Sequence, residues 1–96
     1  MAAWQITVRG RVQGVGYRAA CVARAQRLGL RGWVGNRADG SVQALVAGDE
    51  MQLQAMRNWM QVGPHGARVD ACEIAVLDEN TALEAGSASF HIRVID

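Results

Sequence analysis

The spacing of apolar residues switches along the chain between the period of a strand and the period of a helix, and this order limits the possible folds. Trp4, Ile6 and Val8 alternate with polar neighbours, and a period of two predicts a half-buried strand. Residues 17–28 instead place their apolar side chains on one helical stripe, and Gly29 is a natural stop for that helix. The chain therefore opens with a strand followed by a helix.

The rest of the chain repeats this alternation. It predicts, in order, a strand, a turn, a strand, a helix and a strand, over residues 30–36, 37–40, 41–47, 50–62 and 68–77. Asp49 suits the N-cap of the second helix. A polar loop is expected over residues 78–87, and residues 89–94 predict a short fifth strand or an edge extension. In that last stretch the alternation predicts two sets of side chains, pointing inward at Phe90, Ile92 and Val94 and outward at His91 and Arg93.

Two strand–helix–strand units of this kind make an α+β, ferredoxin-like fold. We expect a βαββαβ sandwich in which one antiparallel sheet of four strands, with or without the short fifth, carries two helices on one face. The chain has 96 residues, which suits one hydrophobic core, so a single domain over residues 1–96 is expected. The fold alone does not identify a function, because this architecture hosts many unrelated activities.

The charged residues exclude several functions. The formal net charge is +1, which predicts no broad field for nucleic acids or membrane surfaces. All 10 basic residues are arginine, so lysine Schiff-base chemistry is excluded, and an anion site with a basic side chain would use the guanidinium fork. No apolar run approaches the ~18 residues of a membrane span, and no export signal precedes the first strand. A cytoplasmic protein without nucleic-acid or membrane partners is expected.

The cysteines and histidines do not suggest a metal site or a disulfide framework. Cys21, His65, Cys72 and His91 are scattered without zinc spacing, and no acidic pair has an obvious magnesium spacing. Small buried apolar roles are expected for both cysteines. Transfer of phosphate through a phosphohistidine stays open as an alternative, although nothing flanks either histidine to support it.

The segment that carries chemistry is GRVQGVGYR, from Gly10 to Arg18, with three glycines among its first seven residues. It is predicted to join the first strand to the first helix. The first N–H groups of a helix have no internal acceptor, and the helix dipole is positive there. Gly14 and Gly16 let the chain curl so that successive N–H groups converge, an arrangement that binds phosphate or carboxylate.

Arg18 strengthens this interpretation. A cation in the first turn of a helix opposes the helix dipole, at a cost of roughly 0.3–1 kcal/mol. That cost is explained if a bound anion lies between the N–H groups and the guanidinium. A solvent-exposed Arg18 is the alternative. The Tyr17 side chain is expected in the core rather than against a ligand.

Other glycine-rich and RNA-binding motifs do not match. A Walker A loop requires a lysine that the chain lacks. The pattern Gly14-x-Gly16-x-x-Ala19 fits the dinucleotide fingerprint only loosely, in a chain too short for a doubly wound sheet. Sheet-type RNA readers require aromatic residues on their central strands, and the expected strands offer few.

Five segments, in order along nearly the whole chain, resemble the acylphosphatase family: GRVQGVGYR, GWVGN at 32–36, DGSV at 39–42, GPHGARVD at 63–70 and FHIR at 90–93. The first two are the more specific. The resemblance implies the ferredoxin-like fold and hydrolysis of acyl phosphates to a carboxylate and orthophosphate, with no cofactor and no metal. The sequence departs from the family pattern at Gly35, where relatives often carry a larger polar residue.

The resemblance also implies roles for individual residues. Arg18 corresponds to the family's phosphate-binding arginine, and Asn36 to the asparagine that positions the attacking water. The phosphate cradle corresponds mainly to main-chain groups, at Gln13, Gly14, Val15, Gly16 and Tyr17. A small acyl phosphate is then the only expected partner, and a monomer is the expected state.

These parts suffice for the chemistry. An acyl phosphate has a carboxylate leaving group, whose conjugate acid has a pKa near ~4, so it leaves without a general acid. Phosphoryl transfer is loose, and the protein contributes mainly position and charge. Three alternatives stay open: a non-catalytic module that senses a phosphorylated metabolite, a fragment of a larger carbamoyl-transferring maturation protein, and a scaffold that contacts RNA or protein.

Overall fold

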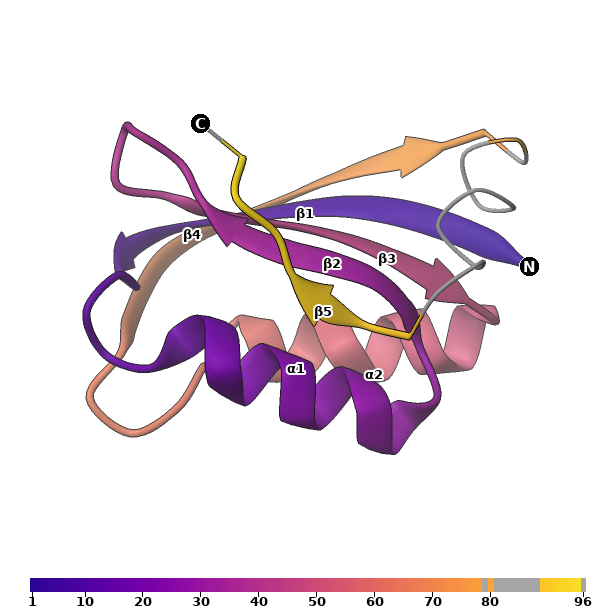
Figure 1. The fold of residues 1–96 in the computed structure, drawn as a ribbon, viewed down its shortest axis with the longest axis horizontal. Coiled ribbons are helices and arrows are strands. Elements are labelled where there is room, and N and C mark those ends of the chain that lie inside the picture. The colour runs from indigo at the N-terminus through magenta and orange to yellow at the C-terminus, as the bar shows by residue number, and fades with distance from the viewer. Residues whose placement is uncertain (79, 81–88, 96) are drawn as a thin grey trace.

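The computed structural model describes residues 1–78, 80 and 89–95, and its elements form one sheet with two helices on the same face (Figure 1). The elements follow the order β1 (Ala2–Arg11), α1 (Tyr17–Leu28), β2 (Arg31–Asn36), β3 (Val42–Gly48), α2 (Glu50–Met60), β4 (Arg68–Leu77) and β5 (His91–Ile92). The prediction of a strand–helix–strand repeat is therefore confirmed. Neither helix in the described part of the chain is long and apolar enough to cross a membrane.

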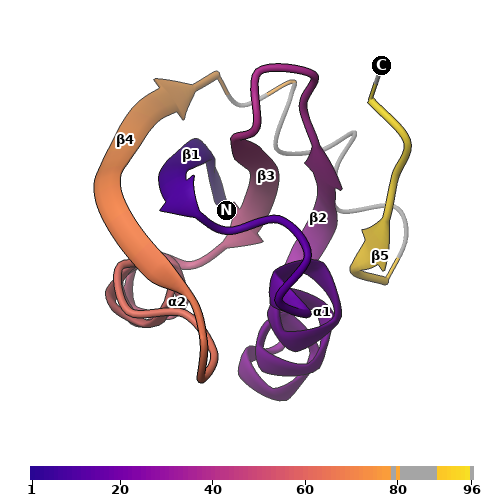
Figure 2. The same cartoon turned by 90° about the vertical axis from the view of Figure 1, so that its left-hand side faces the viewer.

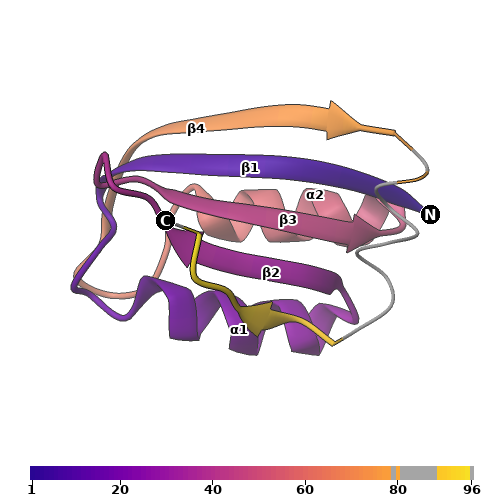
Figure 3. The ribbon, with the colours of Figure 1, turned by 45° about the horizontal axis from the view of Figure 1, so that its top comes forward.

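The sheet has the strand order β4-β1-β3-β2-β5 (Figures 1 and 3). β1 lies between β3 and β4 and is antiparallel to both, and β2 is antiparallel to β3. β5 runs parallel to β2 at the opposite edge from β4. The four antiparallel strands are as expected, but the fifth makes the sheet mixed, because the chain returns along β2 in the direction of that strand. Figure 2, which looks along the sheet, shows its strong twist around the two helices.

β1 extends further than the sequence suggested. Gly10 and Arg11 were expected in the loop, yet both belong to the strand and pair with β4 across a register shift. Gly10 has a φ of 127°, and a Cβ there would lie 2.2 Å from the carbonyl oxygen of Arg68. The glycine therefore allows close approach of β4 at a bulge, and the loop begins only after Arg11.

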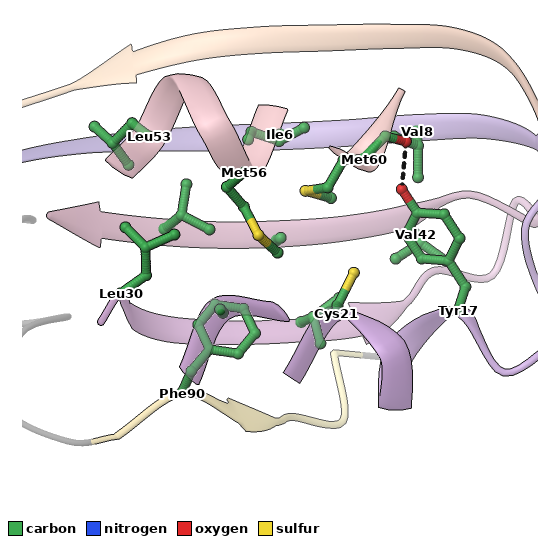
Figure 4. Packing of buried hydrophobic residues seen from close by; sticks show 14 of the residues in the cluster. Ile6, Val8, Tyr17, Cys21, Leu30, Val42, Leu53, Met56, Met60 and Phe90 are labelled. Carbon is green, nitrogen blue, oxygen red and sulfur yellow. Dashed lines mark hydrogen bonds between the residues drawn. The ribbon is translucent and has the colours of Figure 1, made fainter. Parts of the chain in front are cut away.

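The core lies between the sheet and the helices (Figure 4). β1 and β3 contribute alternate apolar side chains, and α2 contributes Leu53, Met56 and Met60, all fully buried. Tyr17 closes one end of the core, where its hydroxyl donates a hydrogen bond of 2.6 Å to the carbonyl oxygen of Met60. Burial in this apolar setting raises the pKa of the Tyr17 hydroxyl, so the side chain is a core residue, as expected.

The two cysteines differ in burial. Cys21 is fully buried on α1, and this burial raises the pKa of its thiol. Cys72 on β4 is only half-buried and packs against the margin of the core. The prediction of a small apolar role is thus confirmed for Cys21, whereas Cys72 lies on an edge strand that no further strand covers in the described part of the chain.

The inward pattern predicted for residues 89–94 holds only at its start. Phe90 is buried, but Ile92 is 45% exposed and Val94 is 84% exposed. β5 has only two residues, so the strict alternation of a strand ends after Ile92. The polar loop predicted over residues 78–87 falls mostly outside the described residues.

Candidate active site

The loop between β1 and α1 leaves the start of a helix open. Gly14 and Gly16 have φ angles of 76° and 77°, the left-handed conformation that favours glycine. Gly16 is the N-cap of α1, which has no side-chain cap and no acidic residue in its first turn. The N–H of Ala20 makes the first hydrogen bond of the helix, at 3.1 Å to the carbonyl oxygen of Gly16. The preceding N–H groups therefore have no acceptor within the helix.

A cavity of about 160 Å³ opens at this loop. Its lining comes from the loop, the first turn of α1, the end of β2 and β5: Val12, Gln13, Gly14, Gly16, Tyr17, Arg18, Ala19, Asn36 and Ile92. The cavity thus joins Arg18 and Asn36, two residues that the sequence analysis had linked only through the family resemblance. It also contains most of the predicted cradle.

Asn36 carries an unusual polar atom. Its Oδ1 is buried and has no hydrogen-bond partner among the described residues. Leaving a buried acceptor unpaired costs roughly 1–3 kcal/mol. The unpaired oxygen therefore belongs to a residue that lines the cavity.

Gln13 contributes to the site in two ways. It is one of the residues that line the cavity. Its side chain turns to the β2–β3 hairpin, where Nε2 donates hydrogen bonds of 2.9 Å to the carbonyl oxygens of both Arg37 and Ser41. The Gln13 amide is therefore occupied by the turn that follows Asn36.

Val15 differs from the other expected cradle residues. It is partly buried and packs against the core, and it is not among the residues that line the cavity. Tyr17 does line the cavity, but its hydroxyl is engaged with Met60. Among the described residues that line the cavity, Arg18 carries the one charged side chain.

The turn after Asn36 is also held from the outer side. Asp39 accepts hydrogen bonds from the hydroxyl and the N–H of Ser41 and forms an ion pair of 3.0 Å with Arg9. These hydrogen bonds, led by that of the Ser41 hydroxyl, hold the pKa of Asp39 well below its usual range. Arg9 pairs in addition with Glu73 at 2.7 Å, which connects the turn to β4.

Sequence reasoning missed the contribution of β5. Ile92 lines the cavity beside Asn36, because its partner in the parallel ladder is Val34, two residues before Asn36 on the same face. The segment FHIR predicted a strand at this position, but it did not predict that the strand would pair with β2. His65 and His91 do not line the cavity. Within the described residues, no cluster of histidine, cysteine and acidic side chains is arranged to hold a metal ion.

Comparisons with known proteins agree on one family. The family model for acylphosphatase matches residues 4–92. A curated acylphosphatase from Cupriavidus pinatubonensis is 59% identical over 73 residues, which are 73% of this chain and 81% of that protein. One from Synechococcus sp. is 49% identical over 90 residues, which are 94% of this chain and 73% of that protein.

The fold comparison gives the same result. The crystal structure of acylphosphatase from Bacillus subtilis superposes with a TM-score of 0.86 at 34% sequence identity. The match covers 97% of this chain and 99% of that one. The likeness therefore includes the whole sheet and both helices.

Proposed function

Because the chain belongs to the acylphosphatase family and hydrolyses acyl phosphates, we propose that one cavity holds its substrate and that Arg18 and Asn36 have separate roles in the reaction. Arg18 and the main chain of residues 13–17 bind the phosphoryl group, and Asn36 orients the attacking water. One observation carries this proposal: a single cavity is lined by Arg18, by the uncapped start of α1 and by Asn36, whose Oδ1 is unpaired.

The phosphoryl group enters a site that attracts negative charge. The open N–H groups at the start of α1 donate to its oxygens, and the helix dipole adds to this attraction. Arg18, in the first turn, can hold two oxygens with its planar guanidinium. These donors stabilise charge that builds up on the equatorial oxygens as the bond to the leaving group lengthens.

Asn36 acts on the other reactant. Its unpaired Oδ1 accepts a hydrogen bond from a water molecule and directs the water oxygen toward phosphorus. An amide is a poor base, so Asn36 acts by orientation, and a phosphoryl oxygen receives the proton. The P–O bond to the acyl oxygen breaks, the carboxylate leaves with the bonding pair, and orthophosphate remains.

No general acid and no metal ion is required in this scheme. The leaving carboxylate has a conjugate acid with a pKa near ~4 and departs unprotonated. We therefore expect hydrolysis of acetyl phosphate to continue at an undiminished rate in EDTA. We also expect no limb in the pH–rate profile near ~6.5, the ordinary pKa of histidine. A metal requirement or a histidine limb would contradict this part of the proposal.

The first test is Arg18→Ala. Loss of one such donor commonly lowers kcat by roughly 10²–10³, and a charged donor should cost at least as much. Phosphate should also stop inhibiting the variant. Arg27→Ala, on the last turn of the same helix, is the matched control and should leave hydrolysis unchanged. Near-normal turnover in Arg18→Ala would place the phosphate site elsewhere.

The second test separates the two roles. Asn36→Ala should lower kcat while inorganic phosphate inhibits as before, because the lost group acts on water and not on phosphate. A large rise in the inhibition constant for phosphate would instead make Asn36 a phosphate ligand. Hydrolysis of a phosphate monoester should be undetectable in every variant, since its alkoxide leaving group needs a proton.

We propose further that the enzyme works as a cytoplasmic monomer and without a nucleic-acid partner. The net charge of only +1 supports the absence of a nucleic-acid partner. Light scattering at several protein concentrations would test the monomer.

A further inference from the structure

The Gln13 side chain joins two parts of the site that are distant in sequence. It leaves the loop just before Gly14 and ends at the β2–β3 hairpin, where one amide nitrogen lies 2.9 Å from the carbonyl oxygens of Arg37 and Ser41. Both acceptors are main-chain atoms, so the contact depends on the course of the backbone and not on the identity of those side chains. The side chain thus bridges the phosphate loop and the hairpin.

The two acceptors stand directly beyond the last pair of the β2–β3 ladder. That pair is Asn36 with Val42, and Arg37 and Ser41 follow it toward the turn. The N–H of Arg37 donates to the carbonyl oxygen of Ser41 at 2.9 Å, and the N–H of Gly40 donates to the carbonyl oxygen of Arg37 at 3.1 Å. Gln13 therefore binds the two residues at the base of the hairpin turn. These residues directly follow the pair that contains Asn36, whose Oδ1 is unpaired.

We propose that Gln13 is a positioning residue, which fixes the distance between the phosphate cradle and Asn36. This inference rests on the proposed function, because it assumes that Asn36 directs the attacking water. The Oδ1 of Asn36 has no partner among the described residues, so its direction depends on how the end of β2 is held. Gln13 is itself the first residue of the cradle, so its side-chain amide sets the separation between the two sides of the reaction.

The requirement is geometric. A loose transition state needs the water oxygen in line with the bond that breaks, and a displacement of about 1 Å can lower a rate by about 10²-fold. The ion pair of Asp39 with Arg9 holds the same turn, but from the exposed side and toward β4. Gln13, by contrast, connects the hairpin to the phosphate loop.

The central experiment uses Gln13→Met, which keeps the length of the side chain and removes its donor. We expect kcat for acetyl phosphate to fall about tenfold, with inhibition by inorganic phosphate within about twofold of the parent. Gln52→Met is the matched control, because Gln52 donates a similar bond of 2.8 Å to the carbonyl oxygen of Leu28, away from the cavity. It should lower the melting temperature and leave kcat unchanged.

A double variant shows whether Gln13 acts through Asn36. In an Asn36→Ala background, Gln13→Met should have little further effect on kcat, since the group it positions is absent. A full additional tenfold loss there would overturn the proposal and give Gln13 an independent role. Unchanged kcat in the single Gln13→Met variant, or a loss confined to phosphate binding, would overturn it as well.

A third measurement does not depend on turnover. The side-chain amide signal of Asn36 in ¹⁵N-labelled protein, assigned by its absence in Asn36→Ala, should shift in Gln13→Met and stay in place in Gln52→Met. An unmoved signal would overturn the positioning role. If kcat is normal in Asn36→Ala but the Asn36 signal shifts in Gln13→Met, the catalytic role proposed for Asn36 is wrong. Gln13 would still position the Asn36 side chain in that case.

Discussion

The two helices begin in opposite ways. α2 starts at Asp49, whose side chain accepts a hydrogen bond from the N–H of Gln52, while the Gln52 side chain accepts one from the N–H of Asp49. Glu50 adds a negative charge in the first turn. α1 starts at Gly16 with no side-chain cap and no acidic residue, and with Arg18 in its first turn. The start of α2 is satisfied by its own residues, and the start of α1 has no side-chain cap.

The two helix starts differ in the features by which a helix stabilises its own N-terminus. A capping box satisfies two of the free N–H groups and an acidic residue balances the dipole. Each feature that stabilises the start of α2 is missing or reversed at the start of α1, whose first residues line the cavity. Under the proposed function, the start of α1 lacks this stabilisation and gains affinity for an anion.

The largest effect should come from exchanging the charges of the two starts. Arg18→Glu removes the guanidinium and places a carboxylate in the cradle, so hydrolysis of acetyl phosphate should fall by more than about 10³-fold. The same change favours the dipole and should raise the free energy of unfolding by about 1 kcal/mol. Urea unfolding and initial rates measure the two effects.

Glu50→Arg is the reciprocal variant in α2. It should lose about 1 kcal/mol of stability and keep its full activity. Equal losses of activity in both variants would mean that the two helix starts do not differ in function.

A smaller effect is expected from the cradle backbone. Gly14→Ala puts a side chain where φ is 76°, at a cost of about 1–2 kcal/mol that the loop can relieve by turning its N–H groups away. The rate should fall by about 10- to 100-fold. Gly66→Ala, with φ at 93° and equally open surroundings, should show a similar loss of stability and normal kinetics. Unchanged rates in Gly14→Ala would remove the cradle from the mechanism.

Bound phosphate should stabilise the start of α1, which lacks a side-chain cap and an acidic residue in its first turn. At ten times its dissociation constant, inorganic phosphate should stabilise the folded protein by about 1.4 kcal/mol, since only the folded state offers the site. The gain should vanish in Arg18→Glu and persist in Glu50→Arg. Thermal unfolding with and without phosphate makes the comparison, and sodium chloride at equal ionic strength is the control. A gain that survives Arg18→Glu would place the anion elsewhere.

The smallest effect belongs to the satisfied helix. Asp49→Ala breaks the capping box and should cost about 1 kcal/mol, which is roughly 4–8 °C in melting temperature for a domain of this size. The kinetic constants should match those of the parent. A change in kcat would show that the start of α2 is coupled to the cavity.

Much of the fold was predictable because its signals are local. The helix over residues 17–28 and its stop at Gly29 follow from apolar spacing and from one glycine, and both match the structure. The extension of β1 through Gly10 was not predictable, because the reason lies in β4. The glycine allows the carbonyl oxygen of Arg68 to come close across the sheet. Two glycines, one at a helix end and one at a strand bulge, look alike in the sequence.

The site was predictable in its parts but not in its assembly. Family resemblance pointed to Arg18 and Asn36, and the structure brings both to one cavity. The bridge from Gln13 to the hairpin could not be foreseen, since its acceptors are main-chain oxygens 24 and 28 residues away. Ile92 was expected in the core and lies half exposed at the cavity, because the parallel pairing of β5 has no signature in a short apolar pattern.

Gly35 lies next to Asn36, and a Cβ there would stand 2.3 Å from the carbonyl oxygen of Arg93 and 2.6 Å from the side chain of Ile95. Residues 93–95 therefore pack closely against β2, the strand that carries Asn36. In evolution, a larger residue at position 35 would require the segment at 93–95 to move away, so these positions should vary as a coupled pair among relatives. A sequence change within residues 93–95 would then alter the position of the strand that carries Asn36 without any change in residues 13–17.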